Sequence, residues 1–507
     1  MSHRINVFII TLITALLAAC GGGGGGSGDE GGGGGSVVGG VGSGSSGSGS
    51  GGTPSAQPEP VKLSAGWHHT CALMDNGTVQ CWGSNGHGEL GDGTTTEDSP
   101  TPVLVVSDNT GTLLTGVEEV SASRYYTCAR LDTGGVKCWG WNEGGKLGDG
   151  KVDYNSFNLS AAVAPFIPYA DEASSSYPVD VVDTNDQPLT DAVSVTAGSW
   201  HACALRENHQ VVCWGQNFDG ALGIGKDPVD FDPLNPDWDT LFSPRALTVV
   251  TAAGSQSPLT DVIQISAGSS DHTCALIDPD QDGKGRVRCW AWNGGSEGQL
   301  GNGNLTDAYA VAPSDPVQLN DGNNTVIENA TQIAAGADHT CALLDTNEVV
   351  CWGWNAYGQV GSNSSAGSAP RAEYVLVDNQ GTRLTDVKRI VTERGSHTCA
   401  LKNDNSLWCW GDNTHGQLGQ DPTLVDKAPF AIPGPTNLPG TILEVAVGGG
   451  GRDPLDNALI QYDGMHTCAL VETNQGKDVW CWGSNDHGQL GDGTTTDSHE
   501  PVQVTGL

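Results

Sequence analysis

The chain has 507 residues, of which 74 are glycine and 16% are charged. Glycine destabilises helix interiors, so this composition favours strands and turns over long helices. The 59 acidic against 22 basic residues give a formal net charge of −37. Such a surface would repel a phosphate backbone, which excludes nucleic acid as a partner.

The first 20 residues predict an export signal. Arg4 provides a basic start, and the apolar run from Val7 to Ala19 is too short to span a bilayer. The residues Leu17 to Cys20 resemble the lipobox of bacterial lipoproteins. The resemblance implies cleavage before Cys20 and lipid attachment to its thiol; the alternative is an ordinary secretory signal with an incidental cysteine. We expect a protein anchored in the cell envelope, at the outer membrane or cell surface.

Residues 21–60 are almost entirely glycine and serine, with prolines at the end. This composition cannot bury enough apolar area to fold, so the segment is predicted to be a flexible tether. Its root-mean-square length is expected to be roughly 35 Å.

Residues 61–507 contain seven copies of one pattern. Each copy has a Cys-Ala phrase, as in His339-Thr-Cys-Ala-Leu, and a Cys-Trp phrase about ten residues later, as in Cys351-Trp-Gly-Trp-Asn. Most copies continue into a Gly-Gln-Leu-Gly turn such as Gly488 to Gly491. The short β-prone runs between Asn, Asp and Gly clusters predict four strands per copy.

Seven four-stranded units predict an all-β fold, a seven-bladed β-propeller. Two segments repeat the beginning and the end of a unit, Val61 to Gly66 and Pro501 to Val504. We expect the C-terminal strand to complete the first blade and so close the ring. The body is expected to be a monomeric propeller.

Spacing between copies varies because some connections are long. The excess lies in Lys151 to Leu189 and in Lys226 to Leu259. Insertions at the same place in each repeat decorate one face of the ring, so this face is the predicted binding surface.

Fourteen of the fifteen cysteines form seven pairs, one in each copy. On adjacent antiparallel strands such pairs are close enough for disulfides, and export supplies an oxidising compartment. Metal binding and free thiols are the alternatives; zinc is disfavoured because close Cys-x-x-Cys pairs are absent. The predicted disulfides are Cys71–Cys81, Cys128–Cys138, Cys203–Cys213, Cys274–Cys289, Cys341–Cys351, Cys399–Cys409 and Cys468–Cys481.

Tryptophans recur in all seven copies and histidines in six, and both are predicted to be structural, because a catalytic residue is expected at one position and a scaffold residue in every repeat. The histidines are His69, His201, His272, His339, His397 and His466. The tryptophans of the Cys-Trp phrases are expected to pack between blades, namely Trp82, Trp139, Trp214, Trp290, Trp352, Trp410 and Trp482. Three additional tryptophans, Trp141, Trp292 and Trp354, are candidate exposed contacts.

One hairpin breaks the symmetry and resembles the first half of a calcium loop. Asp278, Asp280 and Asp282 occupy the first, third and fifth positions, but Cys289 stands where a bidentate glutamate is expected. Calcium is therefore one candidate cofactor, and an acidic turn without metal is the alternative. The sequence contains no nucleophile elbow, phosphate loop or His-Glu-x-x-His motif, so no catalytic residues and no enzyme activity are predicted.

These phrases resemble the repeats of the regulator-of-chromosome-condensation family. The resemblance implies a seven-bladed propeller with a strand exchanged between the ends. It also offers nucleotide exchange on a small GTPase as an alternative function, although the export signal and acidic surface disfavour this and docking on chromatin. Another alternative is a secreted enzyme inhibitor or enzyme. The preferred prediction is a surface module that binds a protein or glycan, because fold alone does not select among these functions.

Overall fold

The computed structural model describes residues 57–152, 174–227, 238–269, 271–293, 297–305, 309–393, 395–450 and 464–507. Residues Glu59–Leu507 form one compact unit. Its described residues form 28 strands and one 3₁₀ turn, η4 (Trp238–Thr240). Among the described residues, no helix has the length and apolar character needed to cross a membrane.

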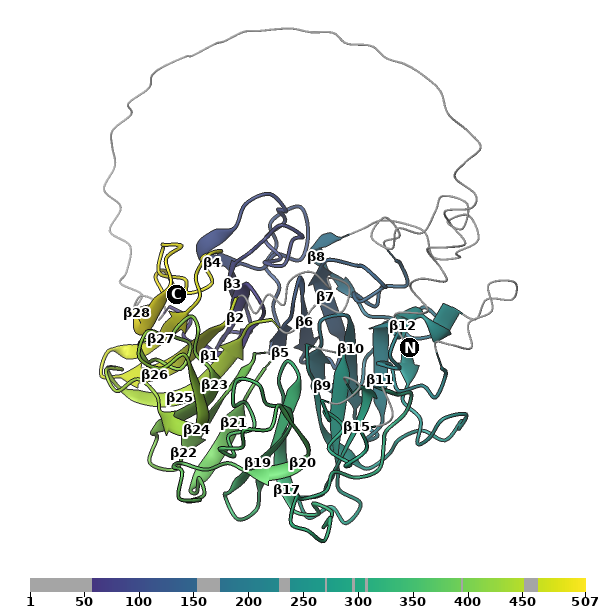
Figure 1. Cartoon of the computed structure of the whole chain (residues 1–507). Helices are drawn as coiled ribbons and strands as arrows, with labels where there is room; N and C mark the ends of the chain where they lie inside the picture. The colour runs from purple at the N-terminus through teal and green to yellow at the C-terminus, as the bar shows by residue number, and fades with distance from the viewer. Residues whose placement is uncertain are drawn as a thin grey trace, which may run out of the picture. The chain divides into compact units, whose positions relative to one another are not determined.

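The strands form seven antiparallel four-stranded sheets, each made of strands consecutive in the chain, which confirms the predicted propeller (Figure 1). The first strands of the seven blades are β1 (Pro60–Ala65), β5 (Val117–Ala122), β9 (Ala192–Ala197), β13 (Val262–Ala267), β17 (Ala330–Ala335), β21 (Val387–Val391) and β25 (Thr441–Gly448). The second strands are β2 (His69–Met74), β6 (Tyr126–Leu131), β10 (His201–Arg206), β14 (His272–Ile277), β18 (His339–Leu344), β22 (His397–Lys402) and β26 (His466–Thr473).

The third and fourth strands complete each blade. The third strands are β3 (Val79–Gly83), β7 (Val136–Gly140), β11 (Val211–Gln216), β15 (Arg286–Trp292), β19 (Val349–Trp354), β23 (Leu407–Asp412) and β27 (Gly476–Gly483). The fourth are β4 (Ser99–Leu104), β8 (Ser175–Asp180), β12 (Phe242–Thr248), β16 (Tyr309–Ala310), β20 (Ser368–Tyr374), β24 (Lys427–Pro433) and β28 (Ser498–Gln503).

Burial changes from the inner to the outer strands. First strands of neighbouring blades contact one another, as β1 contacts both β5 and β25, so they form the inner ring. All six residues of β2 are buried, because β2 lies inside its blade between β1 and β3. The fourth strand β28 has no buried residue and forms the outer edge of its blade.

The predicted ring closure is wrong. Strand β28 pairs with β27 in the seventh blade, and β1 belongs with β2, β3 and β4 in the first. The reason is the phase of the repeat: the folded unit begins with an innermost strand and ends after an outermost one, so each blade is complete. The seventh blade, in yellow, therefore meets the first, in purple, without exchanging a strand (Figure 1).

The same contact joins each pair of neighbouring blades, including the seventh and the first. The indole Nε1 of each Cys-Trp phrase donates a hydrogen bond to a turn carbonyl of the preceding blade, as Trp139 does to Glu89 at 2.8 Å and Trp82 to Gln489 at 2.9 Å. All seven indoles are fully buried, which confirms their predicted packing role. This repeated contact closes the ring without strand exchange.

A histidine–threonine hydrogen bond adds to this contact at six of the seven boundaries. His69 Nε2 lies 2.8 Å from the Thr127 hydroxyl, and His466 Nε2 lies 2.8 Å from that of Thr70. Thr127 in turn donates to the Glu89 carbonyl, so the histidine must donate through Nε2. The recurring histidines are therefore structural, as predicted.

The Gly-x-Leu-Gly turns need glycine for two reasons. Gly491 has a φ of +72°, in the left-handed region that favours glycine. A side chain there would also lie 2.7 Å from Nε1 of Trp82 in the next blade. The motif therefore lets the turn approach the neighbouring indole closely enough to accept its hydrogen bond.

Candidate functional site

The propeller has two different faces. One carries the turns between first and second strands and the connections between third and fourth strands; we call it the insertion face. The segments 153–173, 228–237 and 451–463 all fall in connections of this face, although their residues lie outside the described part. The opposite face, the hairpin face, carries the turns between second and third strands. The predicted insertions Lys151 to Leu189 and Lys226 to Leu259 also contain β8 and β12 with the short hairpins that follow them, and these hairpins lie on the hairpin face.

An aromatic cluster lies on the insertion face across the first three blades. It consists of the rings of Trp67, His87, Tyr125, Trp141 and Trp200. His87 stacks on Trp141 with ring centroids 4.9 Å apart, and Tyr125 meets Trp141 edge-on at 5.3 Å. His87, Tyr125 and Trp141 are partly exposed, whereas the other two rings are buried.

Two buried basic side chains, Arg124 and Lys146, pack against the rings of this cluster. The guanidinium of Arg124, 8% exposed, lies 4.1 Å from the ring centroid of Trp67 and 5.0 Å from that of Trp200. The ammonium of Lys146, 0% exposed, lies 4.4 Å from Trp141 and 4.5 Å from Trp200. Such contacts stabilise a desolvated cation by about 2 kcal/mol each.

Burial also shifts the titration of groups in this region. Burial lowers the pKa of Lys146 to about 7, opposed by the charge of Glu143. Burial raises the pKa of Glu89 to about 7, although backbone hydrogen bonds favour its charged form. Strongly perturbed titratable groups are common at functional sites. Both groups are fully buried, so they support the exposed rings and do not themselves meet a ligand.

The cluster arises where the repeat loses its symmetry. The residue before the histidine position is aromatic in the first three blades, namely His68, Tyr125 and Trp200, and aspartate in the next two. Lys146 occupies the turn position that is glutamine in four other blades. The sequence interpretation missed Arg124 and Lys146 because it concentrated on residues common to all copies. Comparing the variable positions between copies would have found them.

The three additional tryptophans have different surroundings. All three are partly exposed, as expected for candidate contacts. Trp141 belongs to the aromatic cluster, whereas Trp354 in the fifth blade meets Tyr357 edge-on, with ring centroids 5.5 Å apart. Trp292 lies at the equivalent position of the fourth blade.

Each predicted cysteine pair is joined by a disulfide. The partners face each other directly on second and third strands, as Cys341 faces Cys351, with Cα atoms 4.1 Å apart. The other six are Cys71–Cys81, Cys128–Cys138, Cys203–Cys213, Cys274–Cys289, Cys399–Cys409 and Cys468–Cys481. The lipidation site predicted at Cys20 lies outside the described residues.

The calcium-like loop adopts the geometry of a capped turn. The buried Asp278 accepts hydrogen bonds from the backbone N–H groups of Asp282 and Gly283, at 3.2 and 2.8 Å. Asp280 and Asp282 are exposed, and Asp282 caps the N–H of Lys284. Within the described ranges, no three acidic, histidine or cysteine side chains are grouped to hold a metal ion. The carboxylate of Asp278 thus stabilises the turn through these two hydrogen bonds.

Comparison with known proteins assigns the family. An RCC1-like domain model matches residues 169–507, and regulator of chromosome condensation repeats match residues 61–89, 76–130 and 117–146. The chain belongs to the RCC1-like domain family. The family therefore agrees with the resemblance seen in the repeats.

Individual relatives differ in how much of their length corresponds to this chain. The ultraviolet-B receptor UVR8 of Arabidopsis thaliana is 26% identical over 460 residues, covering 89% of this chain and 83% of the relative. Human E3 ubiquitin-protein ligase HERC2 is 27% identical over 318 residues, which cover 62% of this chain but 5% of the ligase.

Solved structures share the fold at lower identity. Human WBSCR16 has a TM-score of 0.60 and 18% identity, covering 85% of this chain and 94% of that protein. Yeast Prp20, in a structure bound to Kap60, has a TM-score of 0.57 and 19% identity, covering 88% and 85%. At these identities the likeness establishes the fold alone.

Proposed function

We propose that the protein is a binding module of the cell envelope that recognises a protein or glycan through the insertion face. The observation that carries this proposal is the aromatic cluster, whose three partly exposed rings lie on the face that also bears the long connections. Tryptophan, tyrosine and arginine dominate the binding energy of protein interfaces. The buried basic side chains fix the rings in place, which reduces the entropy lost on binding.

The known relatives do not supply the partner. Prp20 was studied in complex with Kap60 and for binding to Gsp1p and histones, and UVR8 is a receptor for ultraviolet-B light. These functions differ although the propeller is shared, so the proposal rests on the site of this chain. The ligase activity of HERC2 is not carried over, because the match covers 5% of that protein.

The proposed location follows from the N-terminal sequence. Lipid attached at Cys20 would hold the chain at the envelope, and the segment 21–60 would separate the propeller from the membrane. Intact cells treated with protease, with and without Cys20→Ser, test this. We expect cleavage of the displayed protein on intact cells and release of the Cys20→Ser variant. A protein that stays inside intact cells and resists protease would instead favour nucleotide exchange on a cytosolic GTPase.

The role of the long connections is tested by capture from envelope and secreted extracts with the oxidised protein as bait. Strand β8 lies within Lys151–Leu189, so a deletion must stay within 153–173 to preserve the second blade. A second variant lacks 228–237. The proposal predicts a saturable partner whose binding weakens on at least one deletion, and unchanged binding with both deletions would contradict it.

A further inference from the structure

One blade lacks a side chain that the other six have. After each fourth strand, a backbone N–H donates to the carbonyl of a residue at the start of the third strand. In six blades the donor is a buried valine: Val105, Val181, Val249, Val317, Val375 and Val504. In the sixth blade it is Gly434, which donates to Leu407 at 2.9 Å.

The same blade also lacks the hairpin that follows the valine elsewhere. Five connections between blades fold back as a short hairpin and bury a leucine or isoleucine: Leu114, Leu189, Leu259, Ile327 and Leu384. After the seventh blade, the C-terminal residues provide Val504 and the partly buried Leu507. Between β24 and β25 the connection is only residues 434–440, and its Leu438 is half-buried.

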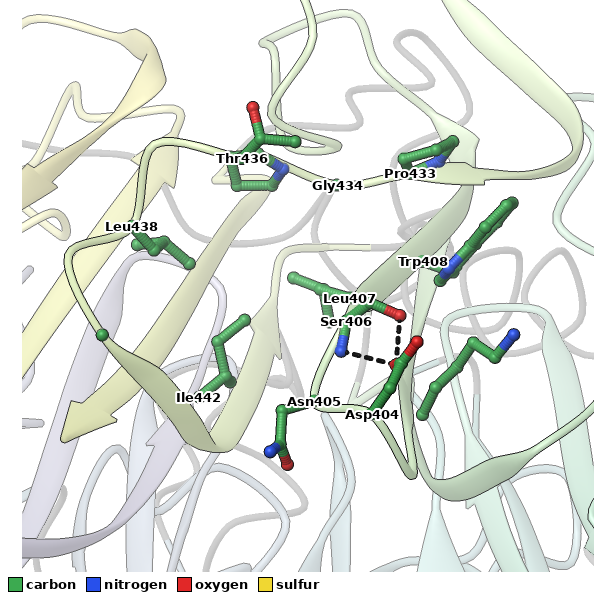
Figure 2. Close-up of a pocket in the computed structure, with 13 residues that line it drawn as sticks. Asp404, Asn405, Ser406, Leu407, Trp408, Pro433, Gly434, Thr436, Leu438 and Ile442 are labelled. Atoms are coloured by element: carbon green, nitrogen blue, oxygen red, sulfur yellow. Dashed lines mark hydrogen bonds between the residues drawn. The ribbon is translucent and has the colours of Figure 1, made fainter.

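A hollow of about 430 Å³ lies at this place on the hairpin face. Leu407 lies between Leu438 and Ile442 on one side and Trp408 on the other (Figure 2). Part of the missing volume is refilled: Leu407 is larger than the valine found at its position in the other blades, and Pro435 lies against Gly419 where a valine methyl lies elsewhere. Leu438 packs partly buried against the core, and the hollow lies open beside it, lined by Leu407, Trp408 and Ile442.

At the neighbouring boundary, a basic residue lies next to the aliphatic side chain of the connecting hairpin. Between the fifth and sixth blades, Leu384 fills the gap, and the adjacent Arg383 pairs with Glu348 at 3.1 Å. Glu348 belongs to the turn between β18 and β19. In the sixth blade the corresponding turn places an exposed carboxylate, Asp404, at the rim of the hollow, which Lys402 also lines. Hydrogen bonds from Ser406 lower the pKa of Asp404, so it stays ionised.

We propose that this hollow binds an extended peptide of a partner protein that presents a leucine, isoleucine or valine side chain beside a basic residue. The aliphatic side chain would contact Leu407, Leu438 and Ile442 in the hollow, as Leu384 contacts the core at the neighbouring boundary, and the basic residue would pair with Asp404. The strongly acidic character of the whole chain favours such a peptide over an acidic one. This site lies on the opposite face from the aromatic cluster, so it does not depend on the proposed function.

The probe is a capped synthetic peptide with the sequence of residues 375–384, which contains both the arginine and the leucine. Its binding to the oxidised full-length protein is measured by fluorescence anisotropy. We expect saturation below about 1 mM. Peptides carrying Leu384→Asp or Arg383→Ser should bind at least tenfold and about threefold more weakly, respectively.

Protein variants locate the binding site. Leu438→Trp fills the hollow and should weaken binding at least tenfold, while Leu424→Trp, at a leucine that is 81% exposed and does not line the hollow, should leave it unchanged. Asp404→Asn should weaken binding about threefold at low salt and reduce its salt dependence. Because Asp404 is exposed, Asp404→Asn should fold normally and still tests the proposal if Leu438→Trp does not fold. The proposal is overturned if the wild-type protein does not bind the peptide, or if the Asp404 and Leu438 variants bind it as the wild type does.

Discussion

At the boundary between the second and third blades, two residues depart together from the repeat. Tyr126 stands at the histidine position and Ala202 at the position of the partner threonine. The Tyr126 hydroxyl reaches across to the carbonyl oxygens of Gly198 and His201, at 2.8 and 2.7 Å. The tyrosine thus supplies alone the hydrogen bond that a histidine and a threonine make elsewhere.

Restoring only one of these residues should destabilise the protein. Tyr126→His leaves a buried imidazole facing Ala202, so we expect a loss of about 1–3 kcal/mol in the free energy of unfolding. The double variant Tyr126→His/Ala202→Thr rebuilds the pair of the other boundaries and should recover at least half of this loss. Denaturant unfolding of the two variants and of Ala202→Thr measures the coupling, and additive effects would contradict the pairing.

The buried histidines should make stability depend on pH. Burial lowers the pKa of His201, His339 and His397 to about 3, and that of His272 and His466 to about 4. In the unfolded chain the imidazole pKa is about 6.5. The stabilisation is therefore complete above pH 6.5 and is lost as the pH falls toward 4, because only the unfolded chain takes up protons in this range.

Each such histidine should lower the free energy of unfolding by about 1.4 kcal/mol for every pH unit below 6.5. We expect the unfolding free energy to fall from pH 6.5 to 5.5, with a smaller slope in His339→Asn. Glu89 contributes in the opposite direction, because burial raises its pKa to about 7, so the comparison between variant and wild type is more informative than the slope alone. Equal slopes in the two proteins would show that His339 becomes protonated within the fold.

Among the elements, the hairpins were the most predictable from sequence. The separation of ten residues between most paired cysteines spans two strands and a tight turn, and the structure places each pair on facing strands. Ring closure was not predictable in this way, because the pattern of Pro501 to Val504 suits the edge of any blade. Only the packing of whole blades decides which edge it joins.

Variants in the hairpin from Asp278 to Gly285 test whether this segment is a hydrogen-bonded turn or a calcium site. Asp278 caps two backbone N–H groups, so Asp278→Ala should destabilise the protein by about 1 kcal/mol, whether or not calcium is present. The exposed Asp280→Ala should have an effect below about 0.5 kcal/mol. Thermal unfolding with calcium or with a chelator checks both variants. A calcium-dependent stabilisation that Asp280→Ala abolishes would instead support the metal site.

For the whole molecule, repetition determines the fold and departures from repetition determine the candidate site. The seven copies predicted the number of blades, because each copy supplies the strands, the cysteine pair and the indole of one blade. The aromatic cluster could not be predicted from any single copy. Its rings come from different blades, and Arg124 contacts both Trp67 and Trp200 only because three blades meet at the insertion face.

The most direct test compares the affinity of a captured partner for three proteins: wild type, Trp141→Ala and Trp354→Ala. Both tryptophans occupy the same position of the repeat and are partly exposed, but only Trp141 belongs to the aromatic cluster. Recognition through the cluster predicts that Trp141→Ala weakens binding at least tenfold, about 1.4 kcal/mol or more, while Trp354→Ala changes it less than twofold. Equal affinities of all three folded proteins would contradict recognition through this cluster.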